Sequence, residues 1–386
     1  MDNKGDINLK NLNVIFHIPW KLITSAPSGS QIRPLRMLEA FKSLGCKVDV
    51  IMGSGAERLR QINLIKQNVK KGKKYDFVYS ESSSYPTSLA YGVKDAVKYP
   101  FLDFRFFVFC KKNNIPIGLF YRDIYWRFPE LLDRPFAKKL VLNIMYRLDL
   151  VVYQKYLDVL YLPSDKMAKY LAFHFPVIKP LPPGAFMYPS SRPVTTTNNN
   201  TNNNKNNNKN TFIFNVLYVG GIGNLYDLRK LVKVIGEIPI ISLTICCREN
   251  EWQNSLNDYE NLLKPNINIV HLSGDDLFSL YEKADVASMF FENVEYRDFA
   301  MPIKLFEYIS HCKPLIVTKG TAAGDFVEIN GIGWAIPYDE KSLLILLNKL
   351  LNDRKELEEK RNKIIEILPL HTWESRALQV CQDLTY

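Results

Sequence analysis

The stretch FNVLYVGGIGNLYDLRKLVKVIG, Phe214 to Gly236, combines an apolar run, a turn with three glycines and an amphipathic run. The near-continuous apolar run FNVLYV is typical of a strand in a parallel sheet that is covered on both faces. Gly220, Gly221 and Gly223 allow the turn to approach a diphosphate closely, next to the N-terminus of the following helix. The same spacing also makes ordinary tight turns, but its place between strand and helix favours the opening unit of a Rossmann-like domain.

The alternation of apolar strands and helices continues on both sides of this stretch. Downstream, the strand-like runs are ISLTICC, INIVHLS, VASMFF and PLIVTKG, and upstream they are NVIFHI, KVDVIMG, DFVYSE and IPIGLFYRD. Such repeated alternation indicates two parallel sheets, each with helices on both faces. We therefore predict an α/β protein of two Rossmann-like domains, with ligands beyond the carboxyl ends of the strands.

An asparagine-rich segment separates the two halves. TTTNNNTNNNKNNNKNT, Thr195 to Thr211, is almost free of apolar residues and cannot support a packed core. One long charged helix is expected over Glu340 to Ile367, followed by a last helix. The predicted organisation is an N-terminal domain (1–190), a disordered linker (191–211), a C-terminal domain (212–370) and a C-terminal helix (371–386) that crosses back to the first domain.

The composition bounds the class of protein. The chain has 386 residues, and 47% hydrophobic content is ample for two cores. No apolar run reaches the roughly 18 to 20 residues of a membrane-spanning helix, and the first residues lack the apolar core of a secretory signal. The six cysteines form no C-x-x-C pair, so we expect buried thiols in a reducing compartment. These observations predict a soluble cytoplasmic protein.

The positive charge is concentrated in the first half. Residues 1–194 contain 30 Lys and Arg against 15 Asp and Glu, and the remainder contains 20 against 25. This asymmetry suggests an anionic partner for the first half, although a merely solvated basic surface is the alternative. No basic helix or strand pattern of a known nucleic-acid reader accompanies it, so we expect no nucleic acid partner.

Two segments of the first half mix aromatic, aliphatic and basic residues. They are YPFLDFRFFVFCKK, 99–112, and RPFAKKLVLNIMYRLDLVVYQKYL, 134–157. Helices that lie in a membrane interface need this mixture, because apolar groups insert while cations meet anionic headgroups. Core packing of amphipathic helices explains much of the same pattern. The segments therefore predict a peripheral contact with an anionic membrane, with core packing as the alternative.

Two turns of the first half carry candidate site residues. In the loop HIPWKLITSAPSGSQIRPLRM, Gly29, Ser30 and Arg33 combine backbone amides with a cation at a helix start, which suits a phosphate or a sugar hydroxyl. In GLFYRDIYWRFP, Arg122 and Asp123 follow an apolar strand directly and have aromatic neighbours. A carboxylate beside aromatic rings suits a sugar, whereas a structural ion pair is the alternative.

The stretch MPIKLFEYISHCKPLIV, Met301 to Val317, places charges in a helix that leads into a buried strand. Pro302 suits the first helical position, and Ile303 follows it. Lys304 and the free amides of the helix N-terminus favour a phosphate, and Glu307, one turn further, can accept two vicinal hydroxyls of a ribose. The alternative is a surface salt bridge between Lys304 and Glu307, worth a few tenths of a kcal/mol.

MPIKLFEYISHCKPLIVTKG, with EINGIGW downstream, resembles glycosyltransferases of the GT-B fold, specifically the retaining family-four-like (group 1) enzymes. The resemblance covers nearly the whole chain, and YRDIYW, YVGGIGNLYDL and MPIKLFEY look like a subgroup that builds bacterial surface polysaccharides. It implies two Rossmann-like domains facing a cleft. It also implies a nucleotide-diphosphate sugar as donor, with Glu307 on the ribose and the amides around Met301 to Lys304 near the diphosphate.

The sequence departs from the family pattern at four positions. The usual pair of glutamates, eight residues apart, would need an acid at Phe299, where only the preceding Asp298 is acidic. Gly221 replaces the usual Arg, and Tyr226 or Asp227 replaces the usual Lys of the same turn. Arg122 replaces the usual His, next to a retained Asp123. These departures concern the sugar-transfer end of the site more than the nucleotide end.

The resemblance therefore implies a glycosyltransferase that uses a UDP- or GDP-sugar and acts on a glycan or lipid-linked acceptor, with Arg122 and Asp123 as candidate catalytic residues. We expect no cofactor and no metal, since amides and Lys304 can stabilise a leaving diphosphate and the chain contains no D-x-D pair of the kind that metal-dependent transferases use. Two alternatives remain, which are a non-catalytic partner subunit and a nucleotide-sugar epimerase of the same fold.

Overall fold

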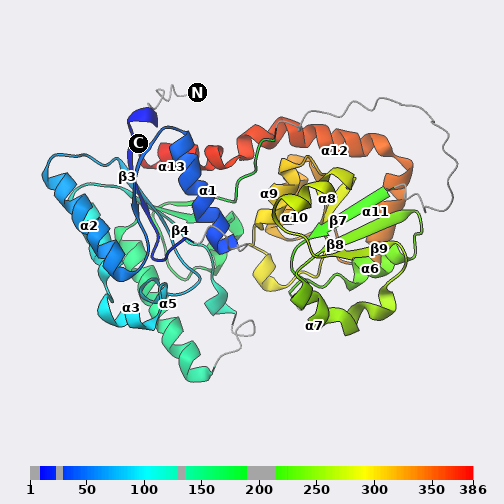
Figure 1. Ribbon diagram of the computed structural model, residues 1–386, viewed down its shortest axis with the longest axis horizontal. Coiled ribbons are helices and arrows are strands. Elements are labelled where there is room, and N and C mark those ends of the chain that lie inside the picture. The colour runs from blue at the N-terminus through cyan, green and yellow to red at the C-terminus, as the bar shows by residue number, and fades with distance from the viewer. Residues whose placement is uncertain (1–8, 23–28, 129–134, 189–213, 224, 386) are drawn as a thin grey trace. The chain divides into compact units, whose positions relative to one another are not determined.

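The computed structural model describes residues 9–22, 29–128, 135–188, 214–223 and 225–385 (Figure 1). They form two compact units. The first unit extends to Gly184 and also includes the segment from Trp373 onward, and the second spans Ala185–Thr372. The predicted linker, 191–211, lies outside the described residues.

The first unit is built on a six-stranded parallel sheet in the order β2-β1-β3-β4-β5-β6. The strands are β1 (Asn13–His17), β2 (Lys47–Ile51), β3 (Phe77–Glu81), β4 (Ile117–Phe120), β5 (Val159–Leu162) and β6 (Ile178–Pro180). The chain moves outward from β1 to β2 and then returns to continue on the other side of β1. The carboxyl ends of β1 and β3 therefore flank the point where the winding direction reverses, which is where such sheets bind ligands.

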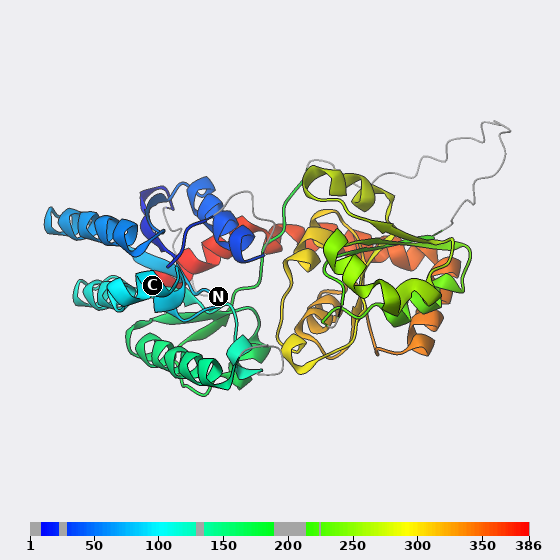
Figure 2. The same cartoon turned by 60° about the horizontal axis from the view of Figure 1, so that its bottom comes forward.

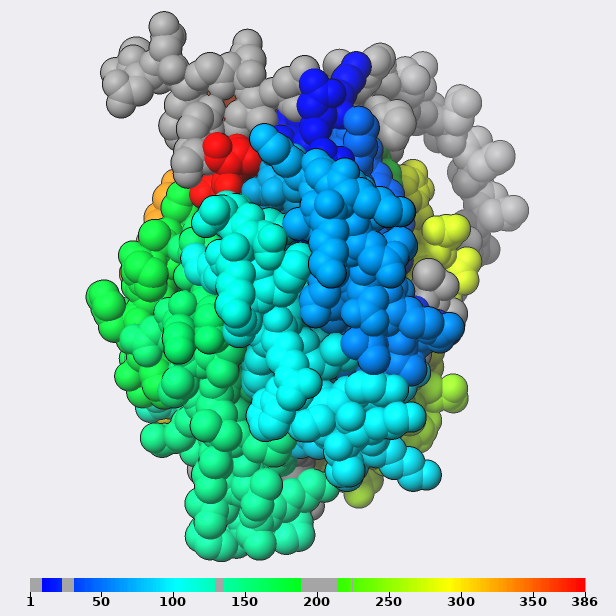
Figure 3. Space-filling model, turned by 90° about the vertical axis from the view of Figure 1, so that its left-hand side faces the viewer, coloured from blue at the N-terminus to red at the C-terminus, as the bar shows by residue number. Residues whose placement is uncertain are grey.

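Helices cover both faces of this sheet. They are α1 (Gly29–Ser43), α2 (Gly55–Lys70), α3 (Val93–Lys98), α4 (Leu102–Lys112), α5 (Phe136–Tyr156) and α13 (Trp373–Leu384), with short 3-10 turns η1 (Leu9–Asn11), η2 (Thr87–Leu89), η3 (Tyr125–Arg127) and η5 (Asp165–Tyr170). The helices α1 and α13 lie side by side in both views (Figures 1 and 2). Figure 3 looks onto the side of the unit that α2, α3, α4 and α5 cover.

The last helix packs directly on the first sheet. A Cβ atom at Gly118 in β4 would lie 2.8 Å from the Leu384 side chain, so only glycine allows this approach. Asp383 accepts hydrogen bonds from Lys179, at 2.5 Å, and from the Tyr161 hydroxyl, at 3.2 Å. The C-terminal helix is therefore part of the first unit, as the sequence predicts.

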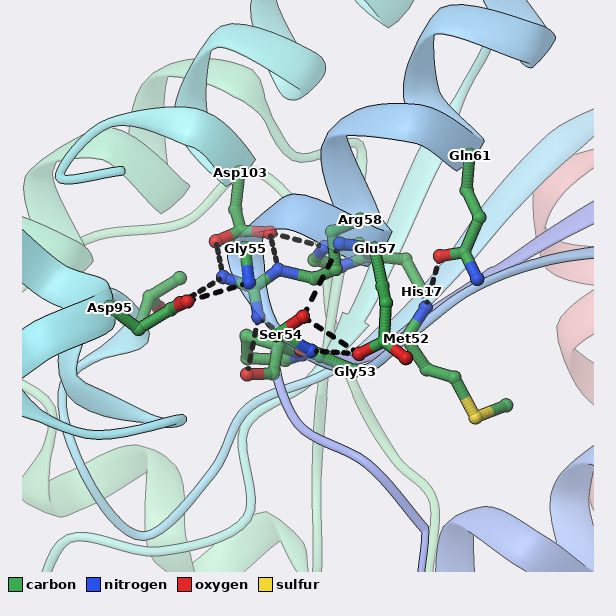
Figure 4. A network of polar contacts seen from close by, with 12 residues as sticks. His17, Met52, Gly53, Ser54, Gly55, Glu57, Arg58, Gln61, Asp95 and Asp103 are labelled. Carbon is green, nitrogen blue, oxygen red and sulfur yellow. Dashed lines mark hydrogen bonds and ion pairs between the residues drawn. The ribbon is translucent and has the colours of Figure 1, made fainter. Parts of the chain in front are cut away.

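A buried polar network fastens three helices to the end of β1 (Figure 4). His17 contacts Ser80 at 2.8 Å and Asp103 at 3.0 Å, and the Arg58 guanidinium donates to Asp103 and to the carbonyls of Pro19 and Gly53. Burial opposes ionisation of Asp103, but His17 and Arg58 lower its pKa. Each of these groups has a partner, so the network is structural in character.

The second unit repeats the architecture with a parallel sheet in the order β12-β11-β10-β7-β8-β9. The strands are β7 (Phe214–Val219), β8 (Ile241–Cys246), β9 (Ile267–Val270), β10 (Val286–Met289), β11 (Leu315–Thr318) and β12 (Gly333–Ile336). The winding reverses between β7 and β10. The glycine turn that follows β7 therefore lies at the expected ligand position of this sheet.

Its helices are α6 (Arg229–Gly236), α7 (Glu249–Tyr259), α8 (Phe278–Lys283), α9 (Ile303–Ser310), α10 (Ala322–Asn330), α11 (Glu340–Asn352) and α12 (Arg354–Ile367), with 3-10 turns η6 (Glu260–Leu262), η7 (Gly274–Leu277), η8 (Glu295–Arg297) and η9 (Leu368–His371). Buried aliphatic and aromatic side chains of β7, β8, β10 and β11 form one core, and partly buried side chains of β9 and β12 pack against it. The predicted α/β architecture of two Rossmann-like parts is confirmed.

Two details of the helix predictions are wrong. The charged segment 340–367 is not one helix, because Asp353 interrupts it and caps α12 by accepting hydrogen bonds from the amides of Lys355 and Glu356. Pro302 is the residue before α9 rather than its first helical residue, and its extended backbone, with ψ of 142°, turns the chain into the helix. The six cysteines are all buried and free, as expected.

Candidate functional site

The structure brings the two predicted donor-binding segments of the second unit together. Tyr308 of α9 accepts a hydrogen bond from the Val219 amide at 2.8 Å and lies 3.3 Å from the Val219 carbonyl. Val219 ends β7 and directly precedes Gly220, and Tyr308 directly follows Glu307. The glycine turn and α9 are therefore joined at the carboxyl edge of the sheet, where its winding reverses.

The glycine turn needs its glycines for local reasons. A Cβ atom at Gly220 would lie 2.7 Å from the Tyr218 hydroxyl, which donates to the Gly221 carbonyl at 2.5 Å. Gly223 has φ of +119°, a backbone conformation that other residues rarely adopt. The turn is thus held close to the sheet, with its backbone unshielded by side chains at Gly220 and Gly221.

The start of α9 leaves donors available for an anion. Pro302 makes no side-chain cap, and the first amides of a helix have no carbonyl partner within it. Leu305, Phe306 and Ile309 bury the inner face of the helix. Lys304 and Glu307 lie on the outer face, where their side chains are 33% and 25% exposed.

Lys304 and Glu307 are ion-paired, with Nζ 2.5 Å from Oε2. The Tyr281 hydroxyl donates to the same oxygen at 3.1 Å. The surface salt bridge considered from the sequence is therefore present. Both contacts use Oε2, so the other carboxylate oxygen of Glu307 has no hydrogen-bond partner among the described residues.

An aromatic cluster packs around Tyr281, whose hydroxyl contacts Glu307. The ring of His311 stacks on Tyr281 with centroids 4.0 Å apart, and Phe278 meets His311 edge-on. Burial, with the charges of Lys313 and Lys304, lowers the pKa of His311 to about 4, so this imidazole is neutral near pH 7. Burial and the Glu307 charge raise the pKa of Tyr281, which keeps its hydroxyl available as a donor.

The position eight residues before Glu307 belongs to the core. Phe299 is 2% exposed and packs edge-on against Tyr296. The neighbouring Asp298 accepts a hydrogen bond from Asn293 at 3.0 Å, and its carbonyl accepts one from the Ala322 amide. This segment therefore supplies a packed ring where the family pattern has a carboxylate.

Sequence reasoning missed Arg297, which is buried near the start of α9. Its guanidinium carbon lies 4.3 Å from the ring centre of Tyr226 and 4.1 Å from that of Phe291. With Ala300 and Pro302 it lines a small cavity of about 20 Å³. No local sequence signal distinguishes this arginine from an exposed one, because both rings that cover it come from other segments.

A second pocket, of about 270 Å³, opens beside the glycine turn. It is lined by Gly223, Asp227, Arg229, Asp258, Tyr259 and Glu292. Asp227 and Arg229 form a two-point ion pair at 3.0 and 2.7 Å. Three carboxylates against one paired guanidinium suit sugar hydroxyls better than a phosphate.

In the first unit, Arg122 pairs with Glu81 rather than with Asp123. Its guanidinium donates to Glu81 Oε2 at 3.1 Å, while Asp123 accepts from the Tyr125 amide at 3.0 Å. The predicted aromatic neighbours are mostly committed to packing: Trp126 is buried and stacks on Tyr146 with centroids 5.5 Å apart. Trp126 is therefore unavailable as a sugar-stacking ring.

Gly29 and Ser30 are the first two residues of α1, and Arg33 in its first turns is buried. Arg33 Nε lies 3.5 Å from Glu81 Oε1, and its guanidinium stacks 3.5 Å from the ring centre of Phe120. No nitrogen of Arg33 makes a hydrogen bond within the described part of the chain.

The carboxyl edge of the first sheet therefore has an excess of positive charge. Arg33 and Arg122 share the single carboxylate of Glu81. Burial lowers the pKa of Arg122, and Arg33 lowers it further, against the opposing charges of Glu81 and Asp123. Burial and the charge of Arg33 lower the pKa of the nearby Arg376 to about 10. Such a cluster favours an anionic group at this edge.

Comparison with known proteins gives a likeness of structure but not of sequence. No protein-family model matches the chain, and no curated protein matches it. HepE (Alr3699) of Anabaena, in complex with UDP, aligns over 97% of this chain and 100% of its own, with 12% identity and a TM-score of 0.63.

WaaG, a glycosyltransferase involved in lipopolysaccharide biosynthesis, aligns over 96% of this chain and 99% of its own, with 14% identity and a TM-score of 0.57. A glycosyltransferase from Rickettsia africae aligns over 97% and 99%, with 15% identity and a TM-score of 0.55. At such identities the likeness concerns the fold. The two parallel six-stranded sheets and their helices thus give this chain the GT-B fold of the glycosyltransferases it resembles.

Proposed function

We propose that the protein is a glycosyltransferase that moves a sugar from a UDP- or GDP-sugar to a glycan or lipid-linked acceptor in polysaccharide or glycoconjugate synthesis. The observation that carries the proposal is the joining of the glycine turn to α9 through Val219 and Tyr308. It brings the backbone of the glycine turn, the N-terminus of α9 and the part-exposed carboxylate of Glu307 together at the edge where such sheets bind ligands. The fold likeness supports the proposal, since one similar structure holds UDP.

The donor lies across these two segments in this proposal. The Gly220 amide already donates to the Cys246 carbonyl at 3.0 Å, so Gly220 contributes a close approach of the backbone. The amides at Gly221 and Gly223 and those at Ile303 and Lys304, following Pro302, face the diphosphate, and Lys304 adds its charge. Glu307 accepts the ribose hydroxyls, held in place by Tyr281. Departure of a nucleoside diphosphate needs stabilisation of negative charge, which helix N-terminal amides and a lysine supply. We propose a metal-independent reaction on this basis, and a retaining one because the sequence resembles the retaining family-four-like enzymes.

The acceptor meets the first unit, at the carboxyl edge formed by β3, β4 and the start of α1. Gly29 and Ser30 begin α1, Arg33 and Arg122 both contact Glu81, and Asp123 follows Arg122. The excess of positive charge around Glu81 favours an acceptor with a phosphate or carboxylate near its reacting hydroxyl. Arg122 and Asp123 are the proposed catalytic residues at this edge.

Membrane contact of the first unit is a further part of the proposal, and α5 supports it. Its outer face exposes six apolar side chains, between 49% and 81% exposed: Phe136, Leu140, Val141, Ile144, Leu148 and Val151. Spacings of three, four and seven residues place them along one stripe of the helix. The helix is the teal segment at the bottom of Figure 3. Core packing therefore does not account for this face.

The charges of α5 match an anionic surface. Lys138, Arg147 and Lys155 are exposed, and the single carboxylate of the helix, Asp149, is buried. Within the described residues no helix is both long and apolar enough to cross a membrane. An apolar stripe flanked by cations is the pattern of a helix that lies in the interface plane. We propose a cytoplasmic protein at the inner face of an anionic membrane.

A test of the donor site compares wild type with Glu307→Ala. Calorimetry with UDP and GDP identifies the base, and transfer from the corresponding sugars measures activity. We expect the variant to lose donor affinity and activity by orders of magnitude while its thermal unfolding is unchanged. Full activity of the variant would sink the site assignment.

A non-catalytic partner subunit is the second candidate, because a packed Phe299 occupies the place of a family glutamate. This candidate would be favoured if the purified chain bound the donor but transferred sugar to no acceptor. Sugar transfer that appears only after a second chain is added would favour it further. Transfer or donor hydrolysis by the purified chain alone would exclude it.

A further inference from the structure

The proposed donor site lacks charge for its ligand. Lys304 is the cation on the outer face of α9, and Glu307, 2.5 Å away, offsets it. A nucleoside diphosphate gains negative charge as it leaves the sugar, and helix N-terminal amides supply only about half a charge. A further cation near the glycine turn or the start of α9 would therefore contribute directly to the reaction.

Arg297 lies where such a further cation is needed. It ends η8, and it lines one small cavity together with Ala300 and Pro302, which precede α9. On its other side, the Tyr226 ring separates it from the glycine turn. The ring atoms lie 3.1 to 3.2 Å from a Cβ position at Gly221, and the guanidinium lies 4.3 Å from the ring centre. Arg297 thus borders the residues before α9 directly and is one aromatic ring away from the glycine turn.

The surroundings of Arg297 leave its charge unmatched. The side chain is 7% exposed, and its guanidinium lies against the rings of Tyr226 and Phe291, which meet edge-on with centroids 5.7 Å apart. Burial lowers its pKa, and the neighbours that oppose this effect are tyrosines. Its Nε has no hydrogen-bond partner within the described residues, and no ion pair to it is found there. A buried guanidinium is costly without an anion, although aromatic faces offset part of the cost.

Arg58 and Arg354 show the usual arrangements. Arg58 is even more deeply buried but donates to Asp103 and to two backbone carbonyls. Arg354 stacks over Phe214 at 4.9 Å and has Asp285 at 3.4 Å as its anion. Arg297 combines deep burial and ring stacking with no such anion among the described residues.

We propose that Arg297 binds the diphosphate of the nucleotide sugar and stabilises it as the leaving group, which rests on the proposed function. The Phe291 ring packs against the guanidinium, whose N–H groups can form two parallel hydrogen bonds to phosphate oxygens. Tyr226, which is partly exposed, moves aside or tilts as the diphosphate enters. Arg297 also contributes to donor specificity, because it strengthens binding of the diphosphate and not of the nucleoside.

The test measures phosphate-dependent affinity. Calorimetry on the full chain determines Kd for the preferred nucleoside diphosphate, its monophosphate and the nucleoside. We compare wild type, Arg297→Met, Arg297→Lys and the control Arg354→Met. Methionine keeps much of the packing volume without the charge, and lysine keeps the charge without the planar fork.

We expect Arg297→Met to weaken diphosphate binding about tenfold or more and nucleoside binding less than twofold. Arg297→Lys should lie between it and wild type, and Arg354→Met should match wild type. Equal diphosphate affinity in wild type and Arg297→Met would leave the proposed function standing but overturn the role of Arg297. Equal losses for nucleoside and diphosphate would also overturn it, because they indicate a structural role. Failure of wild type to bind any nucleoside diphosphate would overturn the proposed function as well.

Discussion

Tyr281 donates its hydroxyl hydrogen bond to Oε2 of Glu307 at 3.1 Å, the oxygen that Lys304 also contacts. The tyrosine comes from α8 and the glutamate from α9, so the contact fixes the carboxylate from outside its own helix. The other oxygen of Glu307 is left for the ligand in the proposed donor site, so Tyr281 is a second residue at which that proposal can be tested.

Replacing Tyr281 with Phe should weaken binding of the preferred nucleoside diphosphate roughly fivefold, because one net hydrogen bond contributes about 1 kcal/mol. The ring contact with His311 is kept. Calorimetry of the variant checks the prediction, and unchanged thermal unfolding checks that the fold is intact. An affinity equal to that of wild type would show that Tyr281 does not position Glu307 for the donor.

The double substitution Ile144→Asp and Leu148→Asp should reduce binding to anionic vesicles at least tenfold, because it places two charges on the apolar stripe of α5. Co-sedimentation with phosphatidylglycerol-rich and with neutral vesicles measures the partition.

The matched control is Ile329→Asp with Ile345→Asp, which makes the same charge change at exposed apolar positions of the second unit. Equal vesicle binding by the two double variants would refute membrane contact through α5. Concentration-dependent dimers of wild type without vesicle binding would instead assign the stripe to a second copy of the chain.

Arg58→Gln should destabilise the protein by about 3 kcal/mol, because it leaves the buried carboxylate of Asp103 without its guanidinium partner. Urea unfolding followed by circular dichroism measures the change. Arg60→Gln, at an exposed position of the same helix, should leave the midpoint within experimental error. A stability loss as small as that of the control would mean that the network in Figure 4 does not hold α2 to the sheet.

Asp149→Asn should stabilise the protein at pH 8 by about 1 to 3 kcal/mol. Burial raises the pKa of Asp149 to about 7, against hydrogen bonds from Thr87, so the folded state favours the protonated acid. A raised carboxyl pKa contributes stability below the unfolded value near 3.8, and this contribution is lost as the pH rises through 7.

The measurement is urea unfolding of wild type and Asp149→Asn at pH 5 and pH 8, with the exposed Asp165→Asn as control. Wild type should lose stability relative to Asp149→Asn between the two pH values. Parallel pH profiles of the two proteins would contradict a protonated Asp149.

The sequence predicts the features that depend on short-range periodicity. Alternating apolar runs predict both sheets, because a strand buried on two faces leaves a continuous apolar run. The three-residue spacing of Lys304 and Glu307 predicts that they are neighbours, and their atoms are 2.5 Å apart. Neither prediction needs knowledge of distant contacts.

Features that depend on distant contacts escape the sequence. Arg122 and Asp123 are adjacent, yet successive side chains of an extended segment diverge, and Glu81 of the neighbouring strand becomes the partner of Arg122. Arg297 is buried only because Tyr226 and Phe291 meet over it. In the sequence, Asp353 is one more charged residue in a helical pattern. Only the structure shows that its side chain caps the start of α12.

The packing of Leu384 against Gly118 has a consequence for synthesis. The first unit consists of two pieces of chain, with all of Ala185–Thr372 translated between them. During synthesis the strands of the first sheet leave the ribosome early. The surface that α13 covers therefore stays exposed until the second unit has also been synthesised. The second unit is one continuous piece of chain, so it can complete its core before the first unit does, although its synthesis begins later. We therefore expect nascent chains that stop before Trp373 to bind chaperones through the first unit.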